Sequence, residues 1–116
     1  MNKFHARAVH ADGYRFASGA EYRRYRELVL LQQAGEISDL QVQPRYEILP
    51  REGTERARHY TPDFEYLEGE RRVAEDVKGG DATITEAASL RMSLFRRRYP
   101  SIELRIIKTR YRREGR

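Results

Sequence analysis

The amino-acid sequence predicts an α/β fold in which two helices flank a mixed β-sheet and a β-hairpin precedes the first helix. Three observations support this. A glycine turn lies between two short apolar segments near the N-terminus, two stretches have the apolar spacing and end signals of helices, and alternating segments separate and follow them. The 116 residues fit a single domain, residues 1–116, with one core.

Residues 1–10 are predicted to form a basic, mobile arm. Asp12 and Gly13 then lie between Ala8-Val9 and Tyr14-Arg15-Phe16. An Asp-Gly pair between such segments is typical of a two-residue hairpin with a type I′ turn. We therefore expect a small hairpin at this end of the chain.

The strongest helical pattern starts at Ser18 and continues to about residue 34. Ser18 is a typical N-cap residue, and Gly35 stands where a helix commonly ends in a left-handed residue. The apolar stripe consists of Tyr25, Leu28, Val29 and Leu31.

The middle of the chain predicts four extended segments that form a meander. These are residues 37–43, 46–49, 60–67 and 72–78. Residues 50–59 are predicted to be a charged loop, and Glu68-Gly69-Glu70 a hairpin-like turn between the last two segments.

A second helix and a last strand follow Gly79-Gly80, which ends the fourth segment. Thr83 or Thr85 caps the helix, which is predicted to reach about residue 98, where Tyr99-Pro100 stops it. Residues 102–107 alternate as a strand, and residues 108–116 are predicted to be a basic tail.

The composition favours a partner that carries phosphate. The net charge is +5 and the pI is about 9.7, with 20 arginines and 3 lysines. Guanidinium groups suit bidentate phosphate contacts, although a GC-rich genome or a thermophilic host also enriches arginine. The chain has no cysteine, which excludes disulfides, thiolate zinc sites and a cysteine nucleophile. With no apolar span, we expect a cytoplasmic protein.

Two carboxylates and a lysine lie near the ends of neighbouring predicted strands. Asp63 follows Pro62, and Asp76 and Lys78 end the next segment. A period of two puts Asp76 and Lys78 on one strand face with Ala74, and antiparallel pairing brings Asp63 beside Asp76. Converging carboxylates suit Mg²⁺ or Mn²⁺, as phosphodiester hydrolysis requires. Because lysine is so rare here, Lys78 beside acids suggests a charge whose protonation matters.

A longer set of motifs surrounds these residues. It comprises Asp12-Gly13-Tyr14-Arg15-Phe16-Ala17-Ser18, Glu21, Leu28, Ala34-Gly35, Ile37, Leu40, Gln43-Pro44, Tyr60, Pro62-Asp63-Phe64, Glu75-Asp76-Val77-Lys78-Gly79 and Tyr99-Pro100. The Pro-Asp and Asp-x-Lys pair resembles the PD-(D/E)XK nuclease superfamily. The full set, over roughly residues 3–107, resembles small bacteriophage-encoded nucleases similar to archaeal-type Holliday junction resolvases.

The resemblance implies a restriction-endonuclease-like core and a Mg²⁺ site in which Mn²⁺ substitutes. It implies Glu21, Asp63, Asp76 and the backbone carbonyl of Val77 as metal ligands, and Lys78 as catalytic base or electrostatic helper. It also implies a homodimer that cuts four-way DNA junctions symmetrically, in the host cytoplasm if the protein is phage-encoded.

Two departures from the family pattern occur. Pro62 stands where the resolvases often have a small hydroxyl residue. The doublet Glu75-Asp76 offers two acids, and Asp76 is chosen because it alone shares a strand face with Lys78.

Several residues have a second interpretation. Glu21 fits a capping box with Ser18, returning to the N-cap amide. Asp76 and Lys78 could form an exposed ion pair of little energetic worth. Glu65 is a supplementary acid or a solvated strand residue, and Gln43 enters the site or is a polar residue at the edge of the core.

Basic side chains outside the site are the predicted DNA contacts, although a charge run is usually a solvated face. They are Arg7, His10, Arg91, Arg97, Arg112 and Arg113. The leading hypothesis is a junction resolvase that leaves 5′-phosphate ends. The alternatives are a less selective nuclease that nicks flaps or duplex, an inactive DNA-binding accessory protein, and a structural or interaction protein.

Overall fold

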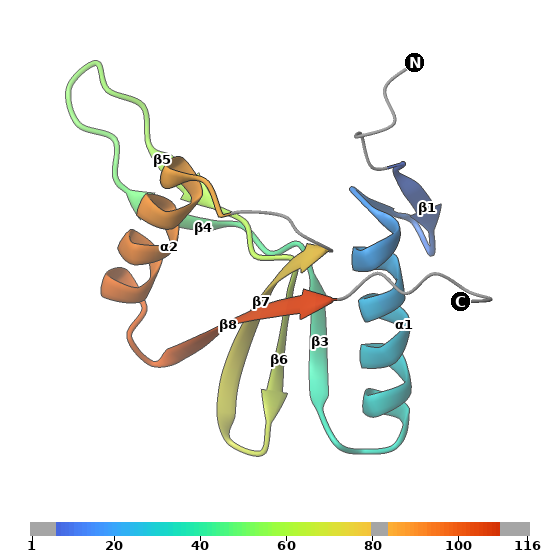
Figure 1. Cartoon of the computed structure of the whole chain (residues 1–116). Coiled ribbons are helices and arrows are strands. Elements are labelled where there is room, and N and C mark those ends of the chain that lie inside the picture. Colours follow the sequence, from blue (N-terminus) through green and yellow to red (C-terminus); the bar gives the residue numbers. More distant parts are fainter. Residues whose placement is uncertain (1–6, 80–83, 110–116) are drawn as a thin grey trace.

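The computed structural model describes residues 7–79 and 84–109 and contains a mixed sheet, two flanking helices and an N-terminal hairpin (Figure 1). The predicted α/β class is therefore confirmed. In chain order the elements are β1 Val9–Ala11, β2 Tyr14–Phe16, α1 Gly19–Gln33, β3 Ser38–Val42, β4 Tyr46–Leu49, β5 Arg58–Tyr60, β6 Phe64–Glu68, β7 Arg71–Gly79, α2 Glu86–Arg98 and β8 Ile102–Thr109.

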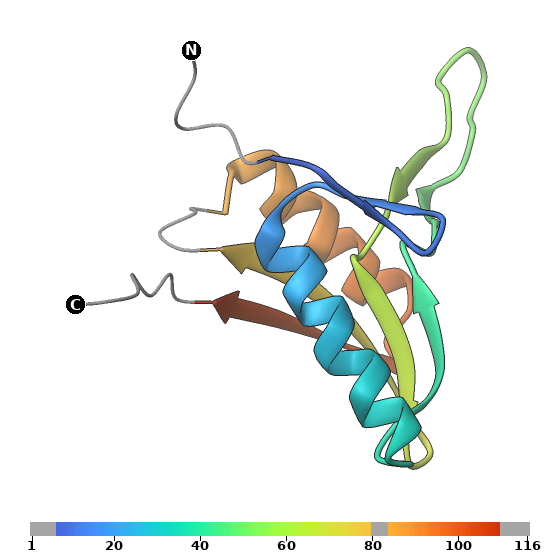
Figure 2. The same ribbon diagram turned by 90° about the vertical axis from the view of Figure 1, so that its right-hand side faces the viewer.

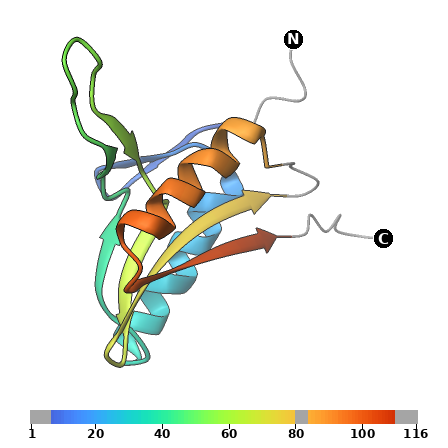
Figure 3. The same ribbon diagram turned by 90° about the vertical axis from the view of Figure 1, so that its left-hand side faces the viewer.

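The main sheet has the strand order β3-β6-β7-β8. The β3–β6 and β6–β7 pairs are antiparallel, whereas β7 and β8 are parallel and are joined through α2. The two helices cover opposite faces of the sheet (Figures 1 and 3). Val73 and Val77 of β7 pack in the α1 core and Ala74 in the α2 core, as expected for side chains that alternate along a strand.

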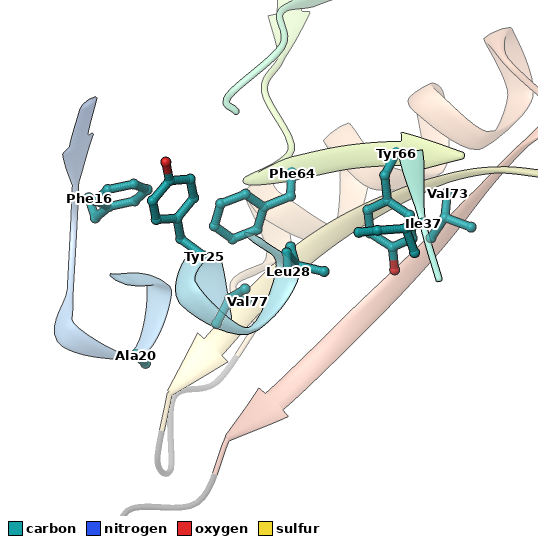
Figure 4. Packing of buried hydrophobic residues seen from close by; sticks show 9 residues of the cluster. All are labelled: Phe16, Ala20, Tyr25, Leu28, Ile37, Phe64, Tyr66, Val73 and Val77. Carbon is teal, nitrogen blue, oxygen red and sulfur yellow. The ribbon is translucent and has the colours of Figure 1, made fainter. Parts of the chain in front are cut away.

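The core under α1 is rich in aromatic rings. Figure 4 shows Phe16, Tyr25 and Phe64 in a row; the ring centroids of Phe16 and Tyr25 are 4.9 Å apart. Because Phe16 comes from β2 and Phe64 from β6, this cluster attaches the N-terminal hairpin to the main sheet through α1. Burial of these rings contributes to the stability of this half of the fold.

A second, two-stranded sheet of β4 and β5 packs on α2. Ile48 and Tyr60 from this sheet are buried with Met92 and Phe95 of α2. Residues 50–57 connect the two strands and extend away from the rest of the fold (Figure 2). The small sheet and Ala74 of the main sheet therefore pack against the same buried face of α2.

The predicted turns and caps are confirmed. Asp12 and Gly13 have φ angles of 54° and 82°, the positive values that a type I′ turn needs at both central positions. Ser18 is the N-cap of α1, and its hydroxyl accepts from the Glu21 amide at 3.2 Å. Gly35 follows α1 with φ 81°, and Thr85 caps α2. Neither helix of the described residues has a stretch long and apolar enough to cross a bilayer.

One predicted strand is wrong in its extent. The segment 60–67 divides into β5 and β6, because Pro62 has no amide hydrogen to donate to a sheet ladder. The charged loop was predicted to extend to residue 59, but it ends at residue 57 because β5 begins at Arg58. This break separates Tyr60 from Asp63 and lets their side chains approach β7 from different elements.

The predicted arm and tail are shorter than expected. Val9 and His10 belong to β1, paired with β2, so the arm does not reach residue 10. Lys108 and Thr109 continue β8 because β7 extends beside them to Gly79. Residues 1–6 and 110–116, which complete the arm and the tail, lie outside the described residues.

Candidate active site

Asp63 and Asp76 meet where β6 begins and β7 approaches its end. The backbone amide of Asp63 donates to the Glu75 carbonyl at 2.8 Å, and Phe64 pairs with Glu75. Asp63 therefore lies beside the Glu75-Asp76 segment, just outside the paired residues. The predicted approach of the two carboxylates across the hairpin is confirmed, although Asp63 itself lies just before β6 rather than within a strand.

Asp76 is held by two donors from different parts of the chain. Its Oδ1 lies 3.1 Å from the Nζ of Lys78, and its Oδ2 accepts from the Tyr60 hydroxyl at 2.6 Å. The exposed fraction of Asp76 is only 8%. An exposed surface ion pair is therefore the wrong description of Asp76 and Lys78.

Glu75 points to the other face of β7 and has a different role. It is fully buried, and its two oxygens accept from the Nε and Nη2 of Arg24 on α1 at 2.8 and 2.6 Å. The Tyr66 hydroxyl also donates to Glu75. This carboxylate is thus occupied by a buried bidentate ion pair, and the choice of Asp76 over Glu75 agrees with the geometry.

The pKa of Asp63 is shifted by burial and by the charges of neighbouring side chains. Burial, together with the negative charges of Glu21 and Asp76, raises the pKa of Asp63 to about 7. The Val77 amide, which donates to Asp63 Oδ2 at 2.6 Å, and the charge of Lys78 act in the opposite direction. The predicted residues thus lie close enough to influence one another's protonation.

Glu21 joins this group from the first turn of α1. Its Oε2 accepts from the Ala17 amide at 3.1 Å, while the Ser18 hydroxyl accepts from the Glu21 amide. Glu21 therefore does act as a cap, but its partner is the amide of Ala17 and not the N-cap amide. Burial raises the pKa of Glu21, and the charge of Asp76 adds to this. Glu21 can therefore cap α1 and lie near Asp76 at the same time.

Replacing Glu21 by Gln separates the two roles. The carboxamide oxygen still accepts from the Ala17 amide, so we expect the free energy of unfolding to change by less than about 1 kcal/mol. Under the nuclease function that the sequence resemblance implies, DNA cleavage should fall on the order of 10²-fold, because a charged side chain of the cluster is lost. The matched control, Ser18→Ala, should lose about 1 kcal/mol and keep cleaving. Normal cleavage by Glu21→Gln in a gel assay would leave Glu21 as a cap alone.

The donor chemistry of the cluster suits a hard divalent cation, because three carboxylates lie in one region and the charges of Glu21 and Asp76 help to raise the pKa of Asp63. In residues 7–79 and 84–109, no group of three or more histidine or acidic side chains is close enough to hold a metal ion. Each carboxylate is held instead by a donor: Glu21 by Ala17, Asp63 by Val77 and Asp76 by Tyr60. At least one of the three carboxylates would have to move for all of them to share an ion. Val77 contributes its amide, and its carbonyl as a ligand stays a prediction.

Glu65 differs from both of its interpretations, whereas the half-buried Gln43 agrees with a polar residue at the edge of the core. Glu65 is buried and binds the Tyr46 hydroxyl and Arg72, so it is neither a supplementary acid nor solvated. Gln43 has φ 54° and donates from its side chain to the Arg15 carbonyl at 2.7 Å, while its amide donates to the Asp63 carbonyl. Gln43 thus connects the N-terminal hairpin to the segment that carries Asp63, without entering the carboxylate cluster.

The predicted DNA contacts lie at separate places. Arg7 and His10 are exposed at the hairpin, and Arg91 and Arg97 are exposed on α2. Arg112 and Arg113 lie outside the described residues. Nearer to the carboxylates, the charge of Arg15 lowers the pKa of Glu21.

Tyr60 is the residue of the site that sequence reasoning missed. Its contact with Asp76 joins residues 16 positions apart on different sheets. The spacing of residues in the sequence does not predict this contact, because the contact depends on how the small sheet is placed against β7.

Comparison with known proteins gives a family. A protein-family model described as "Protein of unknown function (DUF1064)" matches residues 1–113. No curated protein and no solved structure matches the chain. Because the match covers nearly the whole sequence, the chain belongs to the DUF1064 family.

Proposed function

We propose that this protein is a Mg²⁺-dependent DNA endonuclease of the PD-(D/E)XK type. The observation that supports it best is the convergence of Asp63, Asp76 and Lys78 at one end of β7, with Glu21 close enough to affect the protonation of Asp63. Buried carboxylates that repel one another are costly unless they serve a cation, and such clusters occur preferentially at functional sites.

Each residue of the cluster would have a separate role. Glu21, Asp63 and Asp76 would hold the metal with their carboxylate oxygens, together with the carbonyl of Val77. A bound Mg²⁺ or Mn²⁺ supplies a Lewis acid that polarises a phosphate oxygen and makes water more acidic. Lys78 contributes a compact positive charge 3.1 Å from Asp76, where it can offset negative charge on a phosphate or orient the attacking water.

The proposed substrate is branched DNA, most specifically a four-way junction cut symmetrically by a homodimer in the cytoplasm of a host cell. The net charge of +5 supports a polyanionic partner. Exposed arginines at the hairpin and on α2 would contact phosphates. Phosphate contacts carry no information about the base sequence, so they favour recognition of DNA by its shape. The dimer follows from the symmetry of the junction.

The test is cleavage of a synthetic four-way junction, a flap and a linear duplex of equal length, with Mg²⁺, Mn²⁺ or excess EDTA. Metal-dependent cleavage of the junction at paired positions, with slower cleavage of the other two, is expected. Equal rates on all three would replace the resolvase with a general nicking nuclease. Salt-dependent binding without cleavage under any metal would replace it with an accessory protein.

A further inference from the structure

Three buried acidic side chains in the described residues share one kind of contact. Glu65, Glu75 and Asp76 are all at most 8% exposed, and each accepts a hydrogen bond from a tyrosine hydroxyl. The pairs are Tyr46 with Glu65, Tyr66 with Glu75 and Tyr60 with Asp76. A neutral donor that reaches a buried carboxylate replaces part of the lost hydration.

The three carboxylates differ in their positive partners. Glu75 is bound by both arms of the Arg24 guanidinium, and Glu65 by Arg72 at 2.6 Å. Within residues 7–79 and 84–109, the positive partner of Asp76 is the single ammonium of Lys78. An arginine fork holds the plane of a carboxylate, whereas a lysine is a point charge that does not. The orientation of Asp76 therefore depends on its remaining donor, Tyr60.

The position of the Tyr60 ring is set by α2. Tyr60 is 6% exposed, and its ring centroid lies 5.2 Å from that of Phe95. Phe95 is fully buried and also packs against Tyr46 and Tyr99, at 5.2 and 5.4 Å. The phenol is thus held from one side by an aromatic cluster, and its hydroxyl is aimed at β7.

We infer that Tyr60 is a positioning residue that fixes the Asp76 carboxylate for metal binding, an inference that rests on the proposed function. The hydroxyl engages Oδ2 and leaves Oδ1 on the side of Lys78. Without it, repulsion from Asp63 and Glu21 would favour rotation of the carboxylate away from the cluster. The small sheet and α2 thereby help to shape a site built on the main sheet.

The test is Tyr60→Phe, which removes one oxygen atom and keeps the ring. We expect the affinity for Mn²⁺, measured on the protein without DNA by electron paramagnetic resonance, to fall about 10- to 100-fold, as is typical when a partner of a metal ligand is removed. Cleavage of junction DNA should fall at low Mn²⁺ and recover at saturating Mn²⁺. If the cleavage rate fell only because less protein was folded, saturating Mn²⁺ would not restore it in this way.

The matched controls are Tyr66→Phe and Tyr46→Phe, which remove the same hydroxyl from Glu75 and Glu65. Both should bind Mn²⁺ as the unmodified protein does. Equal Mn²⁺ affinities for all three variants would overturn the inference while leaving the nuclease proposal intact. If the unmodified protein neither binds Mn²⁺ nor cleaves DNA, the proposed function itself fails.

A second variant covers the case in which Tyr60→Phe does not fold. Phe95→Leu keeps the Tyr60 hydroxyl but removes the ring that packs on it. A smaller loss of Mn²⁺ affinity, again restored in cleavage at high Mn²⁺, is expected. An unchanged Mn²⁺ affinity of folded Phe95→Leu would count against positioning through the ring.

Discussion

Replacing Asp76 by Asn is expected to reduce metal-dependent DNA cleavage on the order of 10³-fold or more, because the proposed function makes Asp76 a metal ligand at the reacting phosphate. The fold should survive. The carboxamide is nearly the same size, and its oxygen can still accept from the Tyr60 hydroxyl. Initial rates on a synthetic junction in Mg²⁺, together with far-UV circular dichroism, measure both effects.

Asp39→Asn is a suitable control, because Asp39 pairs with Arg72 at the surface and lies on β3. It should cleave normally. In Ca²⁺, which occupies such sites without supporting cleavage, Asp76→Asn should still bind the junction through its arginines. Retained Mg²⁺-dependent cleavage by Asp76→Asn would show that the candidate site is assigned to the wrong residues.

Replacing Arg24 by Met is expected to lower the free energy of unfolding by about 3–5 kcal/mol, the usual effect of leaving a buried charge without its partner. Glu75 is fully buried, and Arg24 is its positive partner. The Tyr66 hydroxyl can compensate only in part. Urea denaturation followed by circular dichroism measures the change.

Two variants test the reason for this loss. Arg71→Met removes the exposed ion pair with Glu103 and should cost at most about 1 kcal/mol. The double variant Arg24→Met with Glu75→Gln should recover part of the loss, since no unpaired charge stays buried. A change below about 1 kcal/mol for Arg24→Met alone would mean that this buried pair contributes no more than a surface pair.

The two neighbours in the Glu75-Asp76 doublet should therefore behave oppositely. Glu75→Gln is expected to reduce stability, with cleavage per folded molecule retained. Asp76→Asn should keep the fold and lose cleavage. One residue along a strand reverses the direction of the side chain, so the same chemical group serves packing against α1 in one case and the carboxylate cluster in the other.

Features that depend on near neighbours in the chain were predictable from the sequence. Ser18 and Gly35 at the ends of α1, the Asp12-Gly13 turn and Thr85 at the start of α2 act through backbone groups a few residues away. The alternation of Asp76 with Glu75 follows from strand geometry alone. The hairpin turn then made the approach of Asp63 to Asp76 predictable.

Other features were decided by tertiary packing. The division of segment 60–67 at Pro62 combines a local cause with pairing of Tyr60 to Tyr46 of β4. The ion pair of Glu75 with Arg24 joins residues 51 positions apart, and no local pattern distinguishes it from a solvated charge. The burial of Glu65 is not predictable from the sequence for the same reason, because the side chains that bind it come from other strands.

The sequence by itself determined the α/β class, both helices with their caps and the adjacency of Asp63, Asp76 and Lys78, because period and turn geometry are local properties. Only the tertiary structure decided that the Tyr60 hydroxyl meets Asp76, that Glu21 caps α1 through Ala17 beside that carboxylate, and that Glu75 is bound by α1. Such contacts depend on how whole elements pack, and the energy of that packing is shared among many buried side chains that no short segment contains.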